Sequence, residues 1–222
     1  MLFGCDSFFS LPNVSRWNKN NNINKNDLFK SNNINNKNNN KNDYNKLKIT
    51  LTTISAKSGC GTGKTALITR FLYNVFHDEI TNHWICIDKY QESVLIDDLK
   101  TNLIIYYIPT AEMYWNINKN CRDKSDCLIF IFDVMDKQSI EDIKGRILLV
   151  KNENNNLESI ICANKCDLEN EKKIFPEDIK ELESEFNIKV FETSVKTGQN
   201  VKEAFEYLIR AIINKRKKEG KI

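Results

Sequence analysis

From Lys46 onward, runs of consecutive apolar residues alternate with segments in which apolar residues recur every three or four positions. The consecutive runs are typical of strands buried on both faces, and the recurring spacing is typical of amphipathic helices. The runs predict strands at 46–56, 94–96, 102–108, 127–132, 159–163 and 189–191. The recurring spacing predicts helices over 64–76, around 140–147, from Pro176 onward and from Asn200 onward.

Strands that are apolar throughout and separated by helices predict an α/β fold, in which helices cover both faces of a mostly parallel sheet. Only the short segment IDDLKT joins the runs at 94–96 and 102–108, so we expect a hairpin at one edge of that sheet. Pro176 suits the first turn of its helix. Asn200 and Glu203 have the spacing of a capping box at the start of the last helix.

Residues 1–45 show neither pattern, and from Trp17 onward they are mostly Asn and Lys. Such a segment has too little apolar surface to offset the entropy lost on ordering. We expect a disordered arm at 1–45, one folded domain at 46–217 and a basic tail at 218–222. An arm that binds nucleic acid or a membrane is the alternative to simple compositional bias. The tract NENNN at 152–156 predicts a surface loop.

The chain's 33 Lys and Arg residues nearly balance its 30 Asp and Glu residues, and a net charge of +3 gives no reason to expect a nucleic-acid partner. No segment approaches the roughly 20 apolar residues that span a bilayer. The opening MLFGCDSFFSLP lacks the basic region and cleavage site of a signal peptide. Seven cysteines without a C-x-x-C pair favour free thiols over a zinc site. We therefore expect a soluble, cytoplasmic protein.

The segment SGCGTGKT at 58–65 stands between the first predicted strand and the first predicted helix. Glycines let a chain curl so that its N–H groups point at phosphate oxygens, and the helix N-terminus adds a positive dipole. Lys64 would reach the β- and γ-phosphates, and the Thr65 hydroxyl would bind Mg²⁺. An ordinary strand–helix turn is the alternative. The predicted phosphate-binding residues are Ser58, Gly59, Cys60, Gly61, Thr62, Gly63, Lys64, Thr65 and Ala66.

Two further motifs follow predicted strands. The motif NKCD (164–167) leaves the strand at 159–163, and ETSVK (192–196) follows the last strand. Asn-Lys pairs are frequent in this chain, so the motif NKCD alone is weak evidence for a base-binding site. Its position supports that interpretation, because it lies at the sheet edge where a base would bind. The run LIFIFD ends at Asp133, which is also the pattern of a metal-holding aspartate in a P-loop kinase or ATPase.

The pieces SGCGTGKTALITRF, CLIFIFDVMD, ANKCDL and FETSVKTGQNVKEAF make residues 46–215 resemble a small GTPase of the Ras superfamily, most like its Rab branch. The resemblance implies a three-layer P-loop NTPase G domain, whose mostly parallel six-stranded sheet has one antiparallel edge strand. It also implies GTP or GDP as the ligand, together with Mg²⁺.

By this resemblance, Asp167 would accept hydrogen bonds from guanine N1 and N2, a donor pair that adenine lacks. Lys165 would stack its stem on the base, Asn164 would tie the base loop to the phosphate loop, and the Val195 amide would meet guanine O6. The implied base-binding residues are Asn164, Lys165, Asp167, Ser194, Val195 and Lys196.

Several of the family's catalytic parts are missing. The threonine of the first switch falls on Trp84, which has no hydroxyl for Mg²⁺. In the second switch, Tyr107 replaces the metal-holding aspartate, Thr110 the glycine hinge, and Ala111 the glutamine that orients the attacking water. Pro109 also fixes φ beside the hinge. We expect nucleotide binding with weak or absent GTP hydrolysis, and we assign no catalytic residue.

The sequence alone does not decide the roles of several other residues. Asp88 or Glu112 is a candidate substitute for the missing carboxylate, and Cys60 places a side chain close to the transition state. The chain ends KRKKEGKI with no cysteine after Cys166, so we expect no prenyl anchor and at most peripheral membrane contact. Cys5 is a minor candidate for acylation.

Three functions fit these features. The first is a Rab-like regulator of vesicle traffic that binds guanine nucleotide and meets effector proteins that the sequence does not identify. The second is a pseudo-GTPase scaffold whose nucleotide is structural or absent. The third is a P-loop kinase or ATPase that uses Asp133, which leaves NKCD and TSVK unexplained.

Overall fold

The computed structural model describes residues 48–56, 61–76, 88–108, 115–116, 119–154 and 156–222. All of these residues lie in one compact unit, Lys41–Ile222, and only this unit is described below. The prediction of a disordered arm at 1–45 lies outside the described residues, and the predicted domain limits stay predictions.

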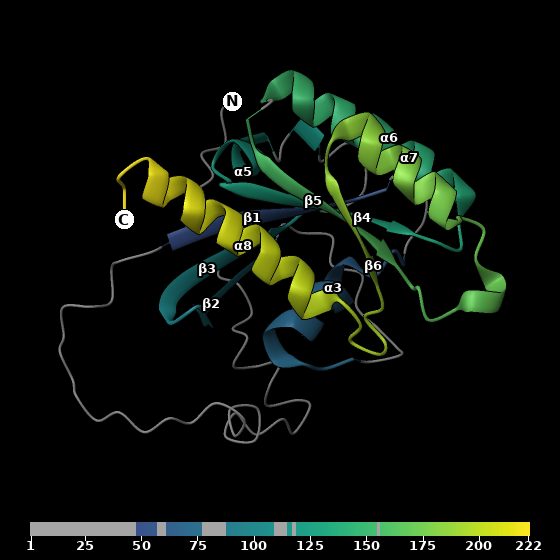
Figure 1. Ribbon diagram of the computed structural model, residues 1–222, viewed down its shortest axis with the longest axis horizontal. Helices are drawn as coiled ribbons and strands as arrows, with labels where there is room; N and C mark the ends of the chain where they lie inside the picture. The colour runs from purple at the N-terminus through teal and green to yellow at the C-terminus, as the bar shows by residue number, and fades with distance from the viewer. Residues whose placement is uncertain (1–47, 57–60, 77–87, 109–114, 117–118, 155) are drawn as a thin grey trace, which may run out of the picture. The chain divides into compact units, whose positions relative to one another are not determined.

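The centre of the unit is a six-stranded sheet with the strand order β2-β3-β1-β4-β5-β6 (Figure 1). Its strands are β1 (Lys48–Ser55), β2 (Asp88–Ile96), β3 (Leu99–Tyr107), β4 (Cys127–Asp133), β5 (Glu158–Asn164) and β6 (Lys189–Thr193). β2 pairs antiparallel with β3, and every other neighbouring pair is parallel. The predicted α/β sheet with one antiparallel edge strand is confirmed.

β2 begins at Asp88, six residues before the predicted strand at 94–96. Its first residues, DKYQES, contain no apolar run, and of them Tyr90 packs against a core cluster. An edge strand needs only one buried face, so the run of consecutive apolar residues that marks a central strand is absent there.

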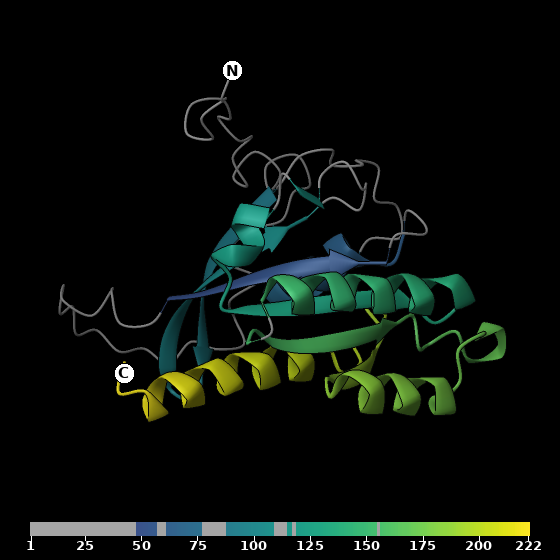
Figure 2. The same ribbon diagram turned by 90° about the horizontal axis from the view of Figure 1, so that it is seen from above.

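The described helices form a layer on each side of the sheet. They are α3 (Lys64–Tyr73), α5 (Lys119–Asp123), α6 (Lys137–Glu153), α7 (Pro176–Phe186), α8 (Val201–Lys218) and the short 3₁₀ helix η1 (Glu169–Glu171). Apolar residues of α3 and α8 join one core cluster, and those of α6 and α7 join another on the opposite face of the sheet (Figure 1). Figure 2 shows the same helices from above. The predicted three-layer arrangement is confirmed.

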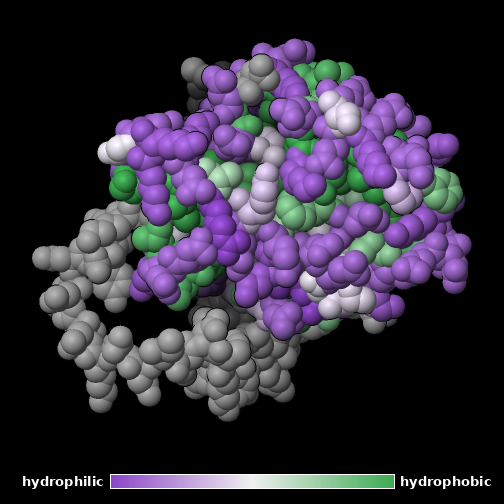
Figure 3. Space-filling model, in the orientation of Figure 1, coloured by the Kyte–Doolittle hydropathy of each residue, from purple (hydrophilic) through white to green (hydrophobic). Residues whose placement is uncertain are grey.

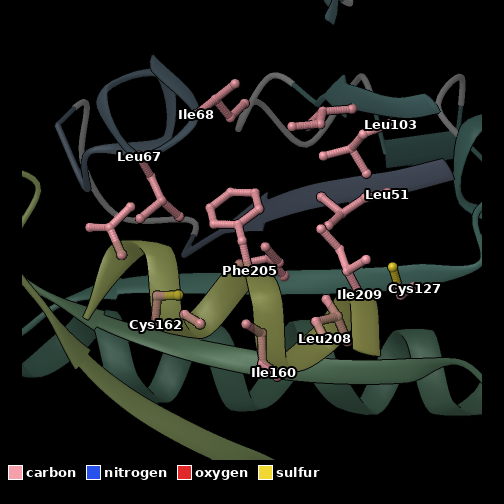
Figure 4. Packing of buried hydrophobic residues seen from close by; sticks show 14 of the residues in the cluster. Leu51, Leu67, Ile68, Leu103, Cys127, Ile160, Cys162, Phe205, Leu208 and Ile209 are labelled. Atoms are coloured by element: carbon pink, nitrogen blue, oxygen red, sulfur yellow. The ribbon is translucent and has the colours of Figure 1, made fainter. Parts of the chain in front are cut away.

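One core contact fixes the helix that follows the glycine segment. Phe71 of α3 stacks on Phe205 of α8, with ring centroids 4.0 Å apart and planes 4° from parallel. Leu67 of α3, Ile209 of α8 and Leu51 of β1 lie in the same cluster (Figure 4). The packing therefore holds α3 against both the sheet and α8.

Two of the predicted element ends were wrong. α3 stops at Tyr73 rather than Phe76, because Asn74 adopts a left-handed φ of 52° and donates its N–H to the Arg70 carbonyl. The tract at 152–156 is not wholly a loop, because α6 continues through Glu153. Arg122 binds the Glu153 carboxylate and so supports this last turn.

The predicted capping box at the last helix was also wrong. Asn200 has a left-handed φ of 54°, and its side chain does not cap α8. It donates instead to the Glu192 carbonyl oxygen at 2.8 Å. By contrast, Pro176 opens α7 as predicted, and the Asp178 carboxylate accepts a hydrogen bond from the Phe175 N–H at 2.8 Å.

The described surface is mostly hydrophilic on the face seen in Figure 3. No helix among the described residues has both the length and the apolar composition needed to cross a membrane.

Candidate functional site

The carboxyl ends of neighbouring strands bring the three motifs to one edge of the sheet. Asp133 at the end of β4 is in register with Asn164 at the end of β5, and Asn164 is in register with Thr193 of β6. β1 ends nearby at Ser55, shortly before the described glycine turn. Ligands of parallel α/β sheets bind at this edge.

The end of the glycine segment requires glycine at two positions. Gly61 and Gly63 have φ values of 113° and 92°, a region that other residues rarely adopt. A Cβ added at Gly63 would lie 2.3 Å from Nδ2 of Asn164, so close approach excludes a side chain as well. α3 begins immediately afterwards at Lys64. Gly61, Gly63 and the N-terminus of α3 are the described part of the predicted phosphate cradle, and a helix N-terminus suits a phosphate.

Asn164 connects the glycine segment to the other motifs. Its side chain is fully buried, and Nδ2 donates to the Thr62 carbonyl oxygen at 2.8 Å. Oδ1 accepts hydrogen bonds from the Val195 N–H at 3.3 Å and from the Thr193 hydroxyl at 3.4 Å. One side chain therefore fixes the relative positions of three loops.

Lys64 is held among protein groups at the same edge. Nζ donates to the Ile108 carbonyl oxygen at 2.5 Å and to the Ser55 hydroxyl at 3.0 Å. It lies 4.5 Å from the centre of the Tyr107 ring, where the resemblance expects a carboxylate. Burial, and to a smaller extent the positive charge of Arg146, lowers the pKa of the Lys64 ammonium to about 7. After Lys64, Thr65 is half-buried and Ala66 is buried in the core cluster, so both predicted residues lie in the first turn of α3.

Lys165 and Asp133 form an ion pair with 2.6 Å between Nζ and Oδ2. The other Asp133 oxygen accepts the Met135 N–H at 2.9 Å. Both oxygens of this carboxylate are thus occupied, which disfavours its use as the metal-holding aspartate of a kinase or ATPase. Lys165 also has a left-handed φ of 70°, so the chain turns sharply as it leaves β5.

Asp167 follows this turn and is half-buried. Within the described part of the chain, no hydrogen bond or ion pair occupies its carboxylate. A carboxylate whose two oxygens are both available can accept two hydrogen bonds from a ligand.

The segment 194–196 is held by its own turn and by α3. The buried Ser194 accepts hydrogen bonds from the Gly198 N–H at 2.8 Å and, through its hydroxyl, from the Thr197 N–H at 3.1 Å. Arg70 of α3 donates to the carbonyl oxygens of Val195 at 2.7 Å and Lys196 at 2.6 Å. Sequence reasoning missed Arg70, because its only local signal is a basic residue two turns into an amphipathic helix.

A second group that sequence reasoning missed lies at Trp115, after the segment that the resemblance predicted to be the second switch. The Arg122 guanidinium stacks 3.9 Å from the Trp115 ring, donates to the Trp115 carbonyl oxygen at 2.7 Å and binds Glu153 through both carboxylate oxygens. The guanidinium of Arg146 lies 4.6 Å from the same ring. These contacts fasten the segment after 109–114 to α6.

Several predicted residues cannot be placed, because they lie outside the described residues. They are Cys5, Ser58, Gly59, Cys60, Trp84, Pro109, Thr110, Ala111 and Glu112, together with the side chain of Asp88.

Comparison with known proteins agrees with this geometry. The model of the Ras family matches residues 58–214. The Ras-related protein Rab-13 of Mesocricetus auratus is 32% identical over 156 residues, and that of Bos taurus is 33% identical over the same length. Each match covers 70% of this chain and 76% of the relative.

Proposed function

The chain belongs to the Ras family, and we propose that it is a Rab-like regulator of vesicle traffic that binds GTP and GDP but hydrolyses GTP slowly or not at all. Family membership implies binding of guanine nucleotide and Mg²⁺ in general. The weak hydrolysis, the traffic role and the individual site residues are parts of the proposal.

Nucleotide binding rests on the buried bridge made by Asn164. It holds the Thr62 carbonyl and the Val195 amide at fixed positions, so the phosphate segment and the base segment are already arranged for one ligand. Gly61 and Gly63 lie directly before the N-terminus of α3, and a helix N-terminus suits a phosphate group. Lys64 and Thr65 would hold the β- and γ-phosphates and Mg²⁺, and Asp167 would bind the guanine edge.

Weak hydrolysis rests on Tyr107. Its ring lies beside the Lys64 ammonium, and a tyrosine supplies no carboxylate for the water shell of Mg²⁺. Losing such a partner costs about 10–100-fold in metal affinity. Hydrolysis is more sensitive than binding to the loss of this carboxylate, because every 1.4 kcal/mol or so of lost transition-state stabilisation slows the reaction about tenfold.

The traffic role rests on the similarity to Rab proteins alone. The last turn of α8 carries exposed Lys217 and Lys218, which suit peripheral contact with an anionic membrane surface. The proposal therefore includes a cytoplasmic location and peripheral contact with endomembranes.

The pseudo-GTPase scaffold is a second candidate, favoured by the protein acceptors that already surround the Lys64 ammonium. Three measurements separate the two functions: the nucleotide that copurifies with the full chain, titration with fluorescent GDP and GTP with and without Mg²⁺, and single-turnover GTP hydrolysis. We expect selective binding of GDP and GTP over ADP, lost in the Lys64→Ala variant, and hydrolysis far below that of an ordinary small GTPase. Absence of guanine-nucleotide binding would refute the proposal in favour of the scaffold. Hydrolysis at an ordinary rate, abolished by Lys64→Ala, would refute its catalytic part.

A further inference from the structure

One strongly bound side chain near the proposed site has no assigned role: Arg70, in the second turn of α3. Its Nε donates to the Val195 carbonyl oxygen at 2.7 Å, and its Nη2 donates to the Lys196 carbonyl oxygen at 2.6 Å. Hydrogen bonds from a charged donor are about twice as strong as neutral ones. Arg70 therefore holds two consecutive carbonyl groups of the segment 194–196.

The guanidinium of Arg70 also donates hydrogen bonds to a residue outside the segment 194–196. Nη1 donates to the backbone carbonyl of Asn74 at 3.1 Å and to its side-chain oxygen at 3.3 Å. The stem of Arg70 lies against Gly198, where an added Cβ would be 3.8 Å from Cδ. Because the guanidinium is planar and held at several points, it sets the spacing between α3 and the segment 194–196.

This spacing joins the two halves of the proposed nucleotide site. α3 begins at Lys64, beside the phosphate cradle, and Arg70 lies about 9 Å further along the helix. The segment 194–196 carries the Val195 N–H, which lies 3.3 Å from Asn164 Oδ1 and would be shared with guanine O6. We infer that Arg70 is a positioning residue that keeps the base-binding segment in register with the phosphate-binding end of α3; this inference rests on the proposed function.

Loss of Arg70 should weaken base recognition without weakening phosphate binding. The φ values of Gly61 and Gly63 and the hydrogen bond from Asn164 to Thr62 do not involve Arg70, so the phosphate cradle persists without it. Without Arg70, the carbonyl groups of Val195 and Lys196 lose their charged donors, and the segment that meets guanine O6 becomes less well ordered. Arg70 therefore acts on the choice of base. A residue that only supported the fold would change the affinity for every nucleotide by the same factor.

The test compares the full-length Arg70→Ala variant with wild type, using fluorescently labelled GDP and IDP, with ADP measured by competition at millimolar concentration. Guanine and hypoxanthine both carry O6, whereas adenine does not. We expect the affinities for GDP and IDP to fall about tenfold and the affinity for ADP to change by less than about twofold.

Two further variants control the experiment. Arg70→Lys keeps the charge, but one ammonium cannot reproduce the planar fork, so its loss of GDP affinity should lie between wild type and Arg70→Ala. If Arg70→Ala does not fold, the Arg70→Lys variant tests the inference in its place. Arg210→Ala removes an exposed arginine that binds Asp97 and Glu206, and it should leave all three affinities unchanged.

Different affinities would refute the positioning role of Arg70 and the proposed nucleotide binding. An equal loss for GDP and ADP, or no loss for GDP, would overturn the positioning role of Arg70. A wild-type chain that binds none of the three nucleotides would refute the proposed function and this inference with it. A wild-type chain selective for GDP whose Arg70→Ala and Arg70→Lys variants behave identically to it refutes the inference alone.

Discussion

The side chain of Asn164 donates a 2.8 Å hydrogen bond to the carbonyl oxygen of Thr62, which lies 102 positions earlier in the chain. Both groups are buried, so water cannot replace the bond if it is lost. The bond joins the end of β5 to the glycine turn before α3, and it makes the two segments one structural unit.

Removing this bond should damage both the fold and the proposed site. In Asn164→Ala, the Thr62 carbonyl loses its buried donor, and we expect the free energy of unfolding to fall by about 1–3 kcal/mol. GDP affinity should fall by more than tenfold. Urea denaturation and fluorescent GDP titration measure the two effects. Asn152→Ala, at an exposed position of α6, is the matched control and should change neither quantity. Unchanged GDP binding by Asn164→Ala would argue against the bridge as a part of the site.

Two glycine-to-alanine variants should have opposite effects on the stability of the protein. Gly63→Ala places a Cβ 2.3 Å from Asn164 Nδ2 at a φ of 92°, so the variant should be destabilised and should lose nucleotide binding. Gly145→Ala adds a Cβ with no atom within 4 Å on the exposed side of α6, and it should stabilise the protein by roughly 0.5–1 kcal/mol. Melting temperatures and GDP titration test the pair. A Gly63→Ala variant that binds GDP normally would contradict the close approach.

A change at Asp167 should alter base selectivity. In Asp167→Asn, the side-chain amide can donate to the carbonyl oxygen that xanthine carries in place of the guanine amino group. We expect GDP affinity to fall and xanthosine diphosphate affinity to rise, each by at least about tenfold. Competition titration measures both, and Glu169→Gln, an exposed neighbour, should change neither. If Asp167→Asn keeps the wild-type preference, the carboxylate does not recognise the base.

A carboxylate at position 107 should restore metal dependence. Tyr107→Asp supplies the missing partner for Mg²⁺, so we expect Mg²⁺ to increase GDP affinity about tenfold more in this variant than in wild type. Tyr107→Phe keeps the ring beside Lys64 and should behave like wild type. GDP titration with Mg²⁺ and with EDTA makes the comparison. A wild-type protein with the full Mg²⁺ dependence of the variant would show that another residue already supplies the carboxylate.

The ion pair of Arg122 and Glu153 should contribute strongly to stability. Arg122 is 2% exposed, and its loss leaves Glu153 without its bidentate partner, so Arg122→Ala should lower the free energy of unfolding by about 3 kcal/mol. Lys119→Ala breaks the exposed pair with Asp123 on the same helix and should cost less than about 1 kcal/mol. Chemical denaturation of both variants tests the difference, and equal losses would show that burial of Arg122 does not matter.

The sequence predicted the parts whose signals are local. Apolar runs indicated β1, β4 and β5 to within one or two residues at each end, and the spacing of Ile140, Ile143 and Ile147 placed α6. The glycine turn could be recognised because two positive φ values leave few residue types to choose from. The length of the edge strand β2 was underestimated, because burial on only one face leaves no continuous apolar run.

The contacts that organise the candidate site could not be predicted in the same way. Arg70 and Arg122 look like ordinary basic residues of amphipathic helices, and their partners lie 125 and 31 positions away. Asp133 matched the pattern of a metal-holding aspartate, but the structure pairs it with Lys165. In each case the partner lies on another element, and only packing brings the two together.

The sequence by itself thus determined the α/β class, the glycine cradle and the candidate motifs, because each depends on conformational preferences and burial within a few residues. The resemblance had indicated that Asn164 ties the base loop to the phosphate loop, but only the tertiary structure decided that its acceptor is the Thr62 carbonyl and that Arg70 reaches Val195 and Lys196. These bonds depend on the register of parallel strands and on the packing of α3 against α8, and neither can be read from the residues on either side of them.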